Sequence, residues 1–522
     1  MHMIQKTKYP IDTASFRRLR EEGYIYVDKT GFIHKLIETG VFFFLARPRR
    51  FGKSLLLDTL AEYFKGNKKL FNNLEITYLQ PGEWKTYPVL RFNLSGIIFT
   101  DPESLINYLN FTIEKYENEF EVKASDSNVE NRFENIISEI YKKTGENLVV
   151  LIDEYDAPLS ATIDNTDLQE VYREQLHGFY SVLKKCDNYI RFCMLTGVTR
   201  YGKVSVFSGL NNLNDITFSN EYASICGITK EELAKYYSEG INSFAEKNNK
   251  TSEEIIEMLR SYYDGYHFSD SMVDIYNPYS INYAMYNLKI DDYWCRSGVP
   301  TLLSKSLLYN DFNIEKLNGR KVDITELSDL SMFALNPIPL FYQTGYLTLK
   351  EYESRRQRFT IGYPNREVEA GILNNILSVY LPGTQDRKGL IYEMEDAMEN
   401  GNPIEFIKIM NSFLAGIPSK LHTYVNKYEN YYHTVFYCLA TLIGLDIDAE
   451  YNTSEGFIDL LIKTEDYIYI IELKINGSAK EAIKQIEEKH YASSFETDNR
   501  KLYKIGIGFS KETNSIKSYE II

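Results

Sequence analysis

The stretch that decides the fold is Phe42-Phe-Phe-Leu-Ala-Arg-Pro-Arg-Arg-Phe-Gly-Lys-Ser54, near the start of a chain of 522 residues. It consists of an apolar strand, a short loop and a Gly-Lys-Ser triplet that opens an amphipathic helix at residues 55–64. Backbone N–H groups at such a loop and helix start can cradle phosphates, because they are unpaired donors at the positive end of the helix. In this pattern Lys53 reaches the outer phosphates, and the Ser54 hydroxyl joins the shell of a Mg²⁺ ion.

Arginines surround the glycine of this loop. The general motif G-x-x-x-x-G-K-[ST] has a glycine where this chain has Arg47, and that glycine normally relieves a tight turn, whereas Gly52 stands in its expected place. Arg47, Arg49 and Arg50 either contact phosphates or form a basic surface. Their closeness to the loop favours contact, since guanidinium groups bind phosphate oxygens well.

A second apolar strand, residues 148–152, ends in two acids, Asp153 and Glu154. We expect Asp153 to hold a water of the Mg²⁺ shell and Glu154 to polarise the attacking water. The alternative is a buried strand whose acids only cap the next element. Together with the phosphate loop, this strand favours a site for ATP or GTP.

The next predicted strand, residues 191–195, leads into Thr196-Gly-Val-Thr-Arg200. A polar group in this place can sense the γ-phosphate, and Thr196 is the candidate. Arg200 is a candidate for stabilising the transferred charge, either in its own chain or in a neighbouring one. A strand-ending turn with a solvated arginine explains the same residues equally well.

The wider pattern predicts an α/β multidomain protein. Strand-length apolar runs alternate with helices from about residue 29 to 199, which indicates a parallel sheet covered on both faces. Residues from about 231 to 375 are mainly helical, with aromatic turn clusters. We predict a P-loop NTPase domain at 1–225, a mainly helical lid or linker region at 226–375, and a third domain at 376–522 whose core spans 426–510.

The third domain has a pattern of its own. A helix at 429–442 precedes strands at 457–462 and 467–475, a polar helix at 479–490 and a strand at 504–509, which is the order αββαβ. Residues two apart on a strand share a face, so Glu472 and Lys474 point the same way. If the first two strands form a hairpin, Asp459 lies roughly opposite Glu472; a slip of one residue would reverse the faces.

Two facing carboxylates, Asp459 and Glu472, suit Mg²⁺ or Mn²⁺, and Lys474 beside them can orient a metal-bound water or help to deprotonate it. Glu429 from the preceding helix and Gln485 from the following one would complete or support the metal shell. Taken alone, a Glu-x-Lys on a half-exposed strand is more commonly a surface ion pair of little energetic worth. The order of acids, lysine and glutamine inside the αββαβ pattern favours the metal site.

Composition narrows the possible functions. With 44% hydrophobic and 25% charged residues, the chain has the balance of a globular protein. The apolar stretch at residues 40–46 is far shorter than the roughly 20 residues of a membrane span, and no signal-peptide pattern precedes it, so we expect a cytoplasmic protein with no membrane partner. The net charge of -15 opposes indiscriminate binding to nucleic acid, so any such site must be local and basic.

On these and further motifs, the chain resembles a known family over nearly its whole length. It is similar to bacterial AAA-ATPase-like proteins that carry a PD-(D/E)XK nuclease domain at the carboxy end. The matching segments are Tyr9–Phe16, Tyr24–Thr30, Arg47–Ser54, Tyr263–Tyr266, Tyr276–Ser280, Gln343–Thr348, Ile458–Leu460, Ile471–Lys474 and Glu481–Gln485. The resemblance implies that Arg47 is a family trait, that the third domain has a restriction-endonuclease-like fold, and that DNA is favoured over RNA as the substrate. Phe457 departs from the family, where arginine is usual.

The leading hypothesis is an ATPase whose ATP binding or hydrolysis licenses metal-dependent cleavage of nucleic acid by Glu429, Asp459, Glu472 and Lys474. The alternative is a regulatory ATPase switch whose nuclease-like domain only binds nucleic acid or a partner. Removal of Lys474 separates the two, since it abolishes activity only in the first. A solute-binding or scaffold protein ranks last, because two independent site patterns would then be accidental. Defence or mobile-element control is an expectation by analogy, and association into a homo-oligomer is left open.

Overall fold

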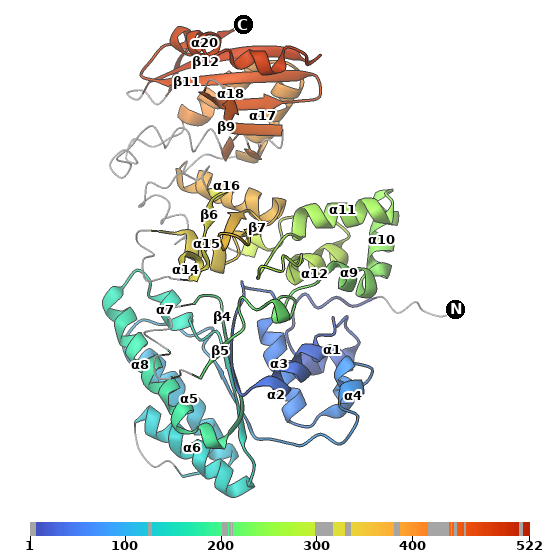
Figure 1. Ribbon diagram of the computed structural model, residues 1–522, viewed down its shortest axis with the longest axis vertical. Coiled ribbons are helices and arrows are strands. Elements are labelled where there is room, and N and C mark those ends of the chain that lie inside the picture. The colour runs from blue at the N-terminus through green and yellow to red at the C-terminus, as the bar shows by residue number, and fades with distance from the viewer. Residues whose placement is uncertain are drawn as a thin grey trace. The chain divides into compact units, whose positions relative to one another are not determined.

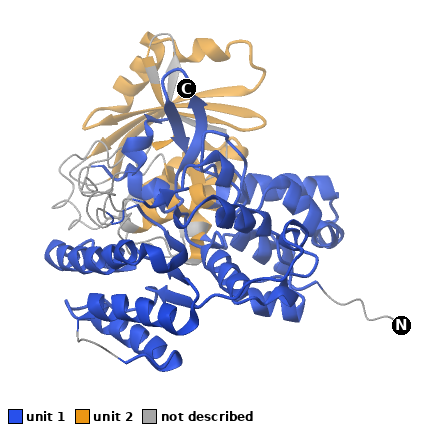
Figure 2. Ribbon diagram, turned by 60° about the horizontal axis from the view of Figure 1, so that its bottom comes forward, with its two compact units in different colours: residues 1–294, 319–367 blue, residues 295–318, 368–522 orange. Residues whose placement is uncertain are grey.

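The structure is a computed structural model. It describes residues 7–123, 128–200, 207, 210, 212–297, 317–328, 336–380, 387–415, 438–439, 441–442, 446–453, 456–510 and 515–522. The chain forms two compact units, coloured separately in Figure 2: unit 1 comprises residues 1–294 and 319–367, and unit 2 comprises residues 295–318 and 368–522. The boundaries predicted at residues 225 and 375 divide the chain differently and stay a prediction.

A parallel sheet lies at the centre of unit 1. Its strands are β1 (Phe42–Ala46), β2 (Val89–Asn93), β3 (Leu148–Asp153), β4 (Ile190–Gly197) and β5 (Asn214–Asp215), in the order β2-β3-β4-β1-β5. Each neighbouring pair is parallel, so the carboxyl ends of the strands meet at one edge. Because β4 lies between β1 and β3, the end of β4 adjoins both the loop after β1 and the acids that end β3.

Helices cover both faces of this sheet, as the alternating pattern predicts. They are α1 (Phe16–Glu22), α2 (Thr30–Thr39), α3 (Lys53–Phe64), α4 (Glu75–Leu79), α5 (Ser104–Glu119), α6 (Val129–Thr144), α7 (Ala157–Ala161) and α8 (Thr166–Lys185). Figure 1 shows α5, α6 and α8 on one side of the sheet and α1 to α4 on the other. Strands β1 and β3 are buried along their whole length for this reason. The predicted P-loop type of parallel sheet is confirmed.

The region that follows in unit 1 is mainly helical, as expected, through α9 (Lys230–Tyr236), α10 (Ser238–Asn248), α11 (Ser252–Tyr263) and α12 (Pro278–Asn287). A small antiparallel sheet then follows that the sequence did not predict. Its strands are β6 (Lys321–Val322), β7 (Thr348–Glu353) and β8 (Arg358–Gly362), accompanied by α14 (Ile324–Ser328) and α15 (Ile338–Gln343). Its strands are short and largely polar, so their hydrophobic alternation is weak.

Unit 2 contains a mixed sheet in the order β13-β12-β11-β10-β9. Its strands are β9 (Asp446–Thr453), β10 (Gly456–Lys463), β11 (Tyr467–Ile475), β12 (Lys501–Ser510) and β13 (Ser515–Ile521). Its helices are α16 (Arg366–Tyr380), which starts at the end of unit 1, α17 (Arg387–Glu399), α18 (Pro403–Ala415) and α20 (Ala479–Glu488).

The strand pairings of unit 2 follow the ββαβ part of the predicted αββαβ order, and most of the helix expected at residues 429–442 lies outside the described residues. Strands β10 and β11 form the expected antiparallel hairpin, and α20 connects β11 to its parallel neighbour β12. Apolar residues of β10, β11 and α20, among them Ile458, Ile470 and Ile483, form the core beneath this helix. Strands β9 and β13 extend the predicted sheet on its two edges. Among the helices that the structure describes, none is long and apolar enough to cross a membrane.

Candidate functional site

The start of α3 has the backbone that a phosphate-binding site needs. Gly52 lies at φ 99°, a conformation that L side chains rarely adopt, and it ends the loop directly before Lys53. No side chain caps the N-terminus of α3. The first N–H groups of a helix lack intrahelical partners and sit at the positive end of the helix dipole. Uncapped, they are available to bind an anion.

Lys53 is buried beneath the loop, with 5% of its surface exposed. Its ammonium donates to the backbone oxygens of Arg47, at 2.8 Å, and Pro48, at 3.0 Å. Burial lowers the pKa of Lys53, and the carboxylates of Asp153 and Glu154 oppose that shift. The lysine of the loop and the acids that end β3 therefore belong to one electrostatic site.

Arg47 has a structural role in this loop, and the predicted phosphate contact of its side chain stays a prediction. Its guanidinium is buried and donates to the backbone oxygens of Ala46 at 2.9 Å, Thr217 at 2.8 Å and Tyr222 at 3.2 Å. It also lies 4.2 Å from the ring centroid of Phe268. The arginine that replaces the usual glycine thus fastens the loop to the segment after β5. Proximity along the chain predicted closeness to phosphate, but it carries no information about the direction of a long side chain.

The other two arginines of the loop are exposed. Arg49 is close enough to the acids for its charge to lower the pKa of Glu154, so it stays a candidate for phosphate contact. Arg50 has φ 68°, and its guanidinium lies 3.8 Å from the ring centroid of Tyr279, a cation–π contact with α12.

The acids at the end of β3 are arranged by β4. Asp153 is 5% exposed, and its Oδ1 accepts the Thr196 hydroxyl at 2.7 Å and the Glu154 N–H at 3.1 Å. Thr196 is fully buried. In this arrangement it orients Asp153, while its predicted role as a γ-phosphate sensor stays a prediction. Burial, and then the charge of Asp153, raises the pKa of Glu154, while Lys53 opposes this. A raised pKa makes Glu154 a stronger base once it is ionised.

Asp156 is a residue that the sequence analysis missed. It is 3% exposed, and its carboxylate accepts the N–H groups of Val198, at 3.2 Å, and Thr199, at 2.7 Å, as well as the Thr199 hydroxyl. A Cβ at Gly197 would lie 2.6 Å from Asp156. Asp156 therefore fixes the turn after β4 and, through it, Thr196. The sequence did contain a signal for Asp156, because it is the third acid in the run Asp153-Glu-Tyr-Asp156 at the end of β3.

Arg200 is held within its own chain. Its side chain donates to the Ser328 hydroxyl at 2.6 Å and pairs with the Asp215 carboxylate at 2.5 Å, and its N–H donates to the Gln343 side chain at 2.6 Å. Its guanidinium also lies 5.1 Å from the ring centroid of Phe218. The alternative of a solvated arginine is wrong. Its predicted action on transferred charge stays a prediction.

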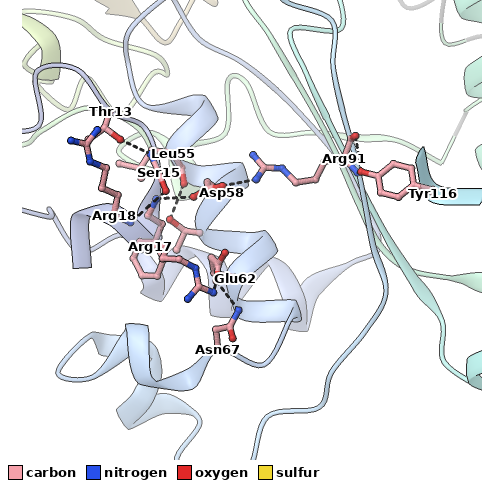
Figure 3. Close-up of polar contacts among 12 residues, drawn as sticks. Thr13, Ser15, Arg17, Arg18, Leu55, Asp58, Glu62, Asn67, Arg91 and Tyr116 are labelled. Atoms are coloured by element: carbon pink, nitrogen blue, oxygen red, sulfur yellow. Dashed lines mark hydrogen bonds and ion pairs between the residues drawn. The ribbon is translucent and has the colours of Figure 1, made fainter. Parts of the chain in front are cut away.

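Helix α3 is anchored from two sides, as Figure 3 shows. The Asp58 carboxylate accepts the Phe16 N–H at 2.7 Å, at the start of α1, and pairs with Arg91 of β2 at 2.5 Å. One turn further along, Glu62 pairs with Arg17 at 2.7 Å. These contacts fix the direction of α3, and with it the aim of its N-terminus.

In unit 2, the hairpin register brings the predicted acids together. Leu460 pairs with Ile471, and continuation of this antiparallel register sets Asp459 opposite Glu472. Asp459 accepts the Leu473 N–H at 2.8 Å through its Oδ2. The predicted acid Glu429 lies outside the described residues.

Glu472 is the most strongly perturbed group of this site. It is 1% exposed; its Oε1 accepts Lys474 Nζ at 3.1 Å and also the Gln485 side chain, while its Oε2 is buried without a hydrogen-bond partner. Burial raises the pKa of Glu472 to about 7, with a further contribution from Asp459 that Lys474 opposes. A buried carboxylate oxygen without a donor fits a cation ligand.

Tyr491 is a second residue that the sequence analysis missed. Burial raises the pKa of its hydroxyl, a hydrogen bond with Gln485 opposes this, and the charges of Glu472 and Asp459 raise it further. A Cβ at Gly456 would lie 3.0 Å from the Tyr491 hydroxyl, so the glycine leaves room for it. Tyrosine is so frequent in this chain, with 43 copies, that its position after Gln485 gave no clear signal.

The two carboxylates of the unit 2 site fit a divalent cation by their chemistry, since Mg²⁺ and Mn²⁺ prefer oxygen ligands. Within the described part of the chain, no group of three His, Cys, Asp or Glu side chains gathers in a metal-binding arrangement. The hairpin register brings Asp459 and Glu472 opposite each other. Oε2 of Glu472 is buried and has no hydrogen-bond partner, so it is the oxygen best placed to bind a cation.

Comparison with known proteins agrees with both predicted domain types. The family model described as a predicted AAA-ATPase matches residues 10–207, and the model of the PD-(D/E)XK nuclease superfamily matches residues 427–519. An "uncharacterized protein in vnfD 5'region" of Azotobacter chroococcum mcd 1 is 31% identical over 529 residues, which cover 99% of each chain. The chain belongs to the AAA-ATPase-like proteins with a carboxy-terminal PD-(D/E)XK nuclease domain. The ATPase match of this AAA-ATPase-like protein includes the phosphate loop and Asp153, and its nuclease match includes Asp459, Glu472 and Lys474.

Proposed function

We propose that this AAA-ATPase-like protein uses ATP binding and hydrolysis in unit 1 to license the cleavage of DNA by unit 2, with Mg²⁺ or Mn²⁺. The observation that carries the nuclease half is the meeting of Asp459, Glu472 and Lys474 on the β10–β11 hairpin. An accidental Glu-x-Lys would be a solvent-exposed ion pair, whereas Glu472 is buried and shares its oxygen with Lys474 and Gln485.

In unit 1, the N–H groups at the start of α3 would hold the phosphates, with Lys53 on the outer ones and Ser54 and Asp153 toward the Mg²⁺ ion that accompanies ATP. Glu154 would take a proton from the attacking water, and its raised pKa supports that role. Thr196 and Asp156 keep Asp153 and the turn after β4 in position. Arg49 is the loop arginine best suited to touch phosphate.

In unit 2, Asp459 and Glu472 would hold the metal ion, and Glu429 is a further proposed ligand. When bound, the metal ion supplies positive charge for the scissile phosphate and lowers the pKa of a water molecule. Lys474 would orient the attacking water, and Gln485, which donates to Oε1 of Glu472, would leave Oε2 available to the ion.

DNA as the substrate, a cytoplasmic location, association into a homo-oligomer and a role in defence or mobile-element control belong to this proposal. The substrate and the role rest on family resemblance and on the pairing of an ATPase with a nuclease; the location follows the expectation from the sequence pattern, and association into a homo-oligomer stays open. The net charge of -15 supports a confined nucleic-acid site over broad binding of the polyanion.

The proposal is tested with purified protein, supercoiled plasmid, linear duplex and single-stranded DNA and RNA, in Mg²⁺ or Mn²⁺. We expect metal-dependent cleavage that Lys474→Ala abolishes and Lys484→Ala leaves intact. Lys484 is a matched control because it lies on α20 as an exposed ion pair with Glu488. Cleavage that survives Lys474→Ala would come from another site or a contaminant and would overturn the nuclease assignment.

ATP hydrolysis is measured on the same preparations. We expect Lys53→Ala to abolish it and Lys65→Ala, at the other end of α3, to leave it unchanged. Intact ATP hydrolysis without cleavage under any condition would favour the alternative of a regulatory switch whose nuclease-like domain only binds nucleic acid or a partner.

A further inference from the structure

Three consecutive backbone oxygens of the phosphate loop are all engaged from within unit 1. Lys53 Nζ donates to the oxygens of Arg47 and Pro48, at 2.8 and 3.0 Å. The next oxygen, that of Arg49, accepts the indole N–H of Trp294 at 3.2 Å. Lys53, which would reach a bound phosphate, and the Trp294 indole therefore bind adjacent peptide groups of one short loop.

The same loop packs against the segment around Trp294. A Cβ at Gly345 would lie 2.7 Å from the Pro48 ring and 3.6 Å from the Trp294 indole, so the absence of a side chain there lets the three meet. The Trp294 indole also lies 5.0 Å, centroid to centroid, from the ring of Tyr346. A change in the loop cannot be absorbed locally, because packed interiors transmit displacement to their neighbours.

Trp294 is bound in turn to the start of α16. Glu367 is 1% exposed; its Oε1 accepts the Trp294 N–H at 2.5 Å, and its Oε2 accepts the Ser280 hydroxyl at 2.7 Å. Trp294 and Glu367 are also the last residues of unit 1 before the chain enters unit 2 at residues 295 and 368. Helix α16 begins at Arg366 and continues into unit 2.

We propose that Trp294 and Glu367 form a relay that carries the nucleotide state of the phosphate loop to the two places where the chain leaves unit 1. This inference rests on the proposed function and specifies how the two activities are coupled. A phosphate attracts the Lys53 ammonium away from the oxygens of Arg47 and Pro48, because a charged acceptor binds an ammonium more strongly than a neutral carbonyl does. The peptides of the loop then reorient, and the Arg49 oxygen takes the Trp294 indole with it.

The shift reaches α16 through the buried carboxylate of Glu367. Breaking its bond to the Trp294 N–H would leave a buried charge with one donor fewer, which is costly, so Glu367 follows the tryptophan. A helix is stiff enough to pass the displacement of its first turn along its length. Trp294 and Glu367 act here as positioning residues and touch neither nucleotide nor nucleic acid.

The relay is tested first by fluorescence of the full chain. The sequence has two tryptophans, so Trp84→Phe leaves Trp294 as the sole tryptophan reporter. Addition of a non-hydrolysable ATP analogue with Mg²⁺ should change the Trp294 emission, with a midpoint equal to the affinity from calorimetry. The change should disappear in Trp84→Phe/Lys53→Ala. Hydrogen exchange of the first turn of α16 should change on binding as well, a readout that does not need nuclease activity.

The second test compares two matched variants. Trp294→Phe removes the indole bond to Arg49 and keeps an aromatic ring, and Trp84→Phe removes an equivalent indole bond, to the Gln80 oxygen at 3.0 Å. Allosteric coupling of this kind is typically about 5- to 150-fold. In Trp294→Phe, ATP should change the rate of cleavage by less than about threefold. In Trp84→Phe, the full stimulation by ATP should persist. Cleavage without ATP should be unchanged in both, and Glu367→Gln should resemble Trp294→Phe.

The outcomes separate the relay from the proposed function. An analogue that binds by calorimetry while the Trp294 emission and the exchange of α16 stay constant would overturn the relay and leave the ATPase intact. Full stimulation by ATP in Trp294→Phe would overturn it as well. If the wild-type protein shows no cleavage, the proposed function fails, while a Trp294 response that Lys53→Ala abolishes would still support the relay.

Discussion

Replacement of Glu472 with glutamine should stabilise unit 2 at mildly alkaline pH and leave its stability nearly unchanged at acidic pH. Burial and the nearby charge of Asp459 raise the pKa of Glu472 from 4.5 to about 7. Because the pKa is higher in the folded protein than in the unfolded chain, the stability that this group contributes is fully present below pH 4.5 and is lost as the pH rises through about 7. Glutamine does not ionise and avoids that loss.

The size of the effect follows from the shift. One pKa unit corresponds to about 1.4 kcal/mol, so a difference of 7 − 4.5, or 2.5 units, gives roughly 3 kcal/mol at about pH 8. The side chain is 1% exposed, so solvent screening reduces this little. Glutamine keeps one oxygen for the contact with Lys474. We expect a gain of about 3 kcal/mol near pH 8 and close to none near pH 4.5.

Hydrogen exchange of the β11 and β12 amides is the suitable assay, because both tryptophans, Trp84 and Trp294, lie in unit 1. Glu465→Gln, at the exposed turn between β10 and β11, is the control and should show no such dependence on pH. Mg²⁺ should narrow the difference, since an ion bound by the folded wild-type site stabilises it. Equal or lower protection of Glu472→Gln near pH 8 would refute the reasoning.

Three further predictions concern unit 1. Gly52→Ala forces a side chain into φ 99° and should weaken ATP binding about tenfold by calorimetry, because such strain costs about 1 to 3 kcal/mol; unchanged affinity would contradict the assigned backbone. Thr196→Val removes the 2.7 Å bond to Asp153 and should lower kcat for ATP hydrolysis about tenfold with little change in KM, whereas a change in KM alone would assign Thr196 to ATP binding. Arg47→Met removes the guanidinium donors to the oxygens of Ala46, Thr217 and Tyr222 and should destabilise unit 1 by about 3 kcal/mol in thermal unfolding; a purely phosphate-binding arginine would leave stability unchanged.

The parts of the fold that the sequence predicted best are those where local pattern and tertiary environment agree. Strands β3 and β11 lie within one residue of the ranges expected, because largely apolar runs between polar turns have few other ways to be buried. The hairpin register was conditional in the sequence, because β11 is buried on both faces and a slip of one residue would still have buried apolar side chains. The glycine of the phosphate loop was recognisable because few residues tolerate its backbone.

The parts that the sequence did not reveal depend on contacts between distant residues. Arg47 bonds to the oxygen of Thr217, 170 positions away, and nothing near Arg47 in the sequence indicates that partner. Asp156 acts on a turn that follows a different strand. The small sheet of β6, β7 and β8 has short strands whose order along the chain differs from their order in space. Tyr491 reaches its site only because the chain turns back after α20.

The most direct test of the central claim is the single-turnover rate of DNA cleavage in Mg²⁺, measured with and without ATP, for the wild-type protein and Lys53→Ala. The account predicts faster cleavage with ATP in the wild type and one slow rate, with or without ATP, in Lys53→Ala, because the variant keeps the nuclease residues and loses the phosphate contact. Wild-type cleavage that proceeds at the same rate with and without ATP would contradict the coupling of the two sites.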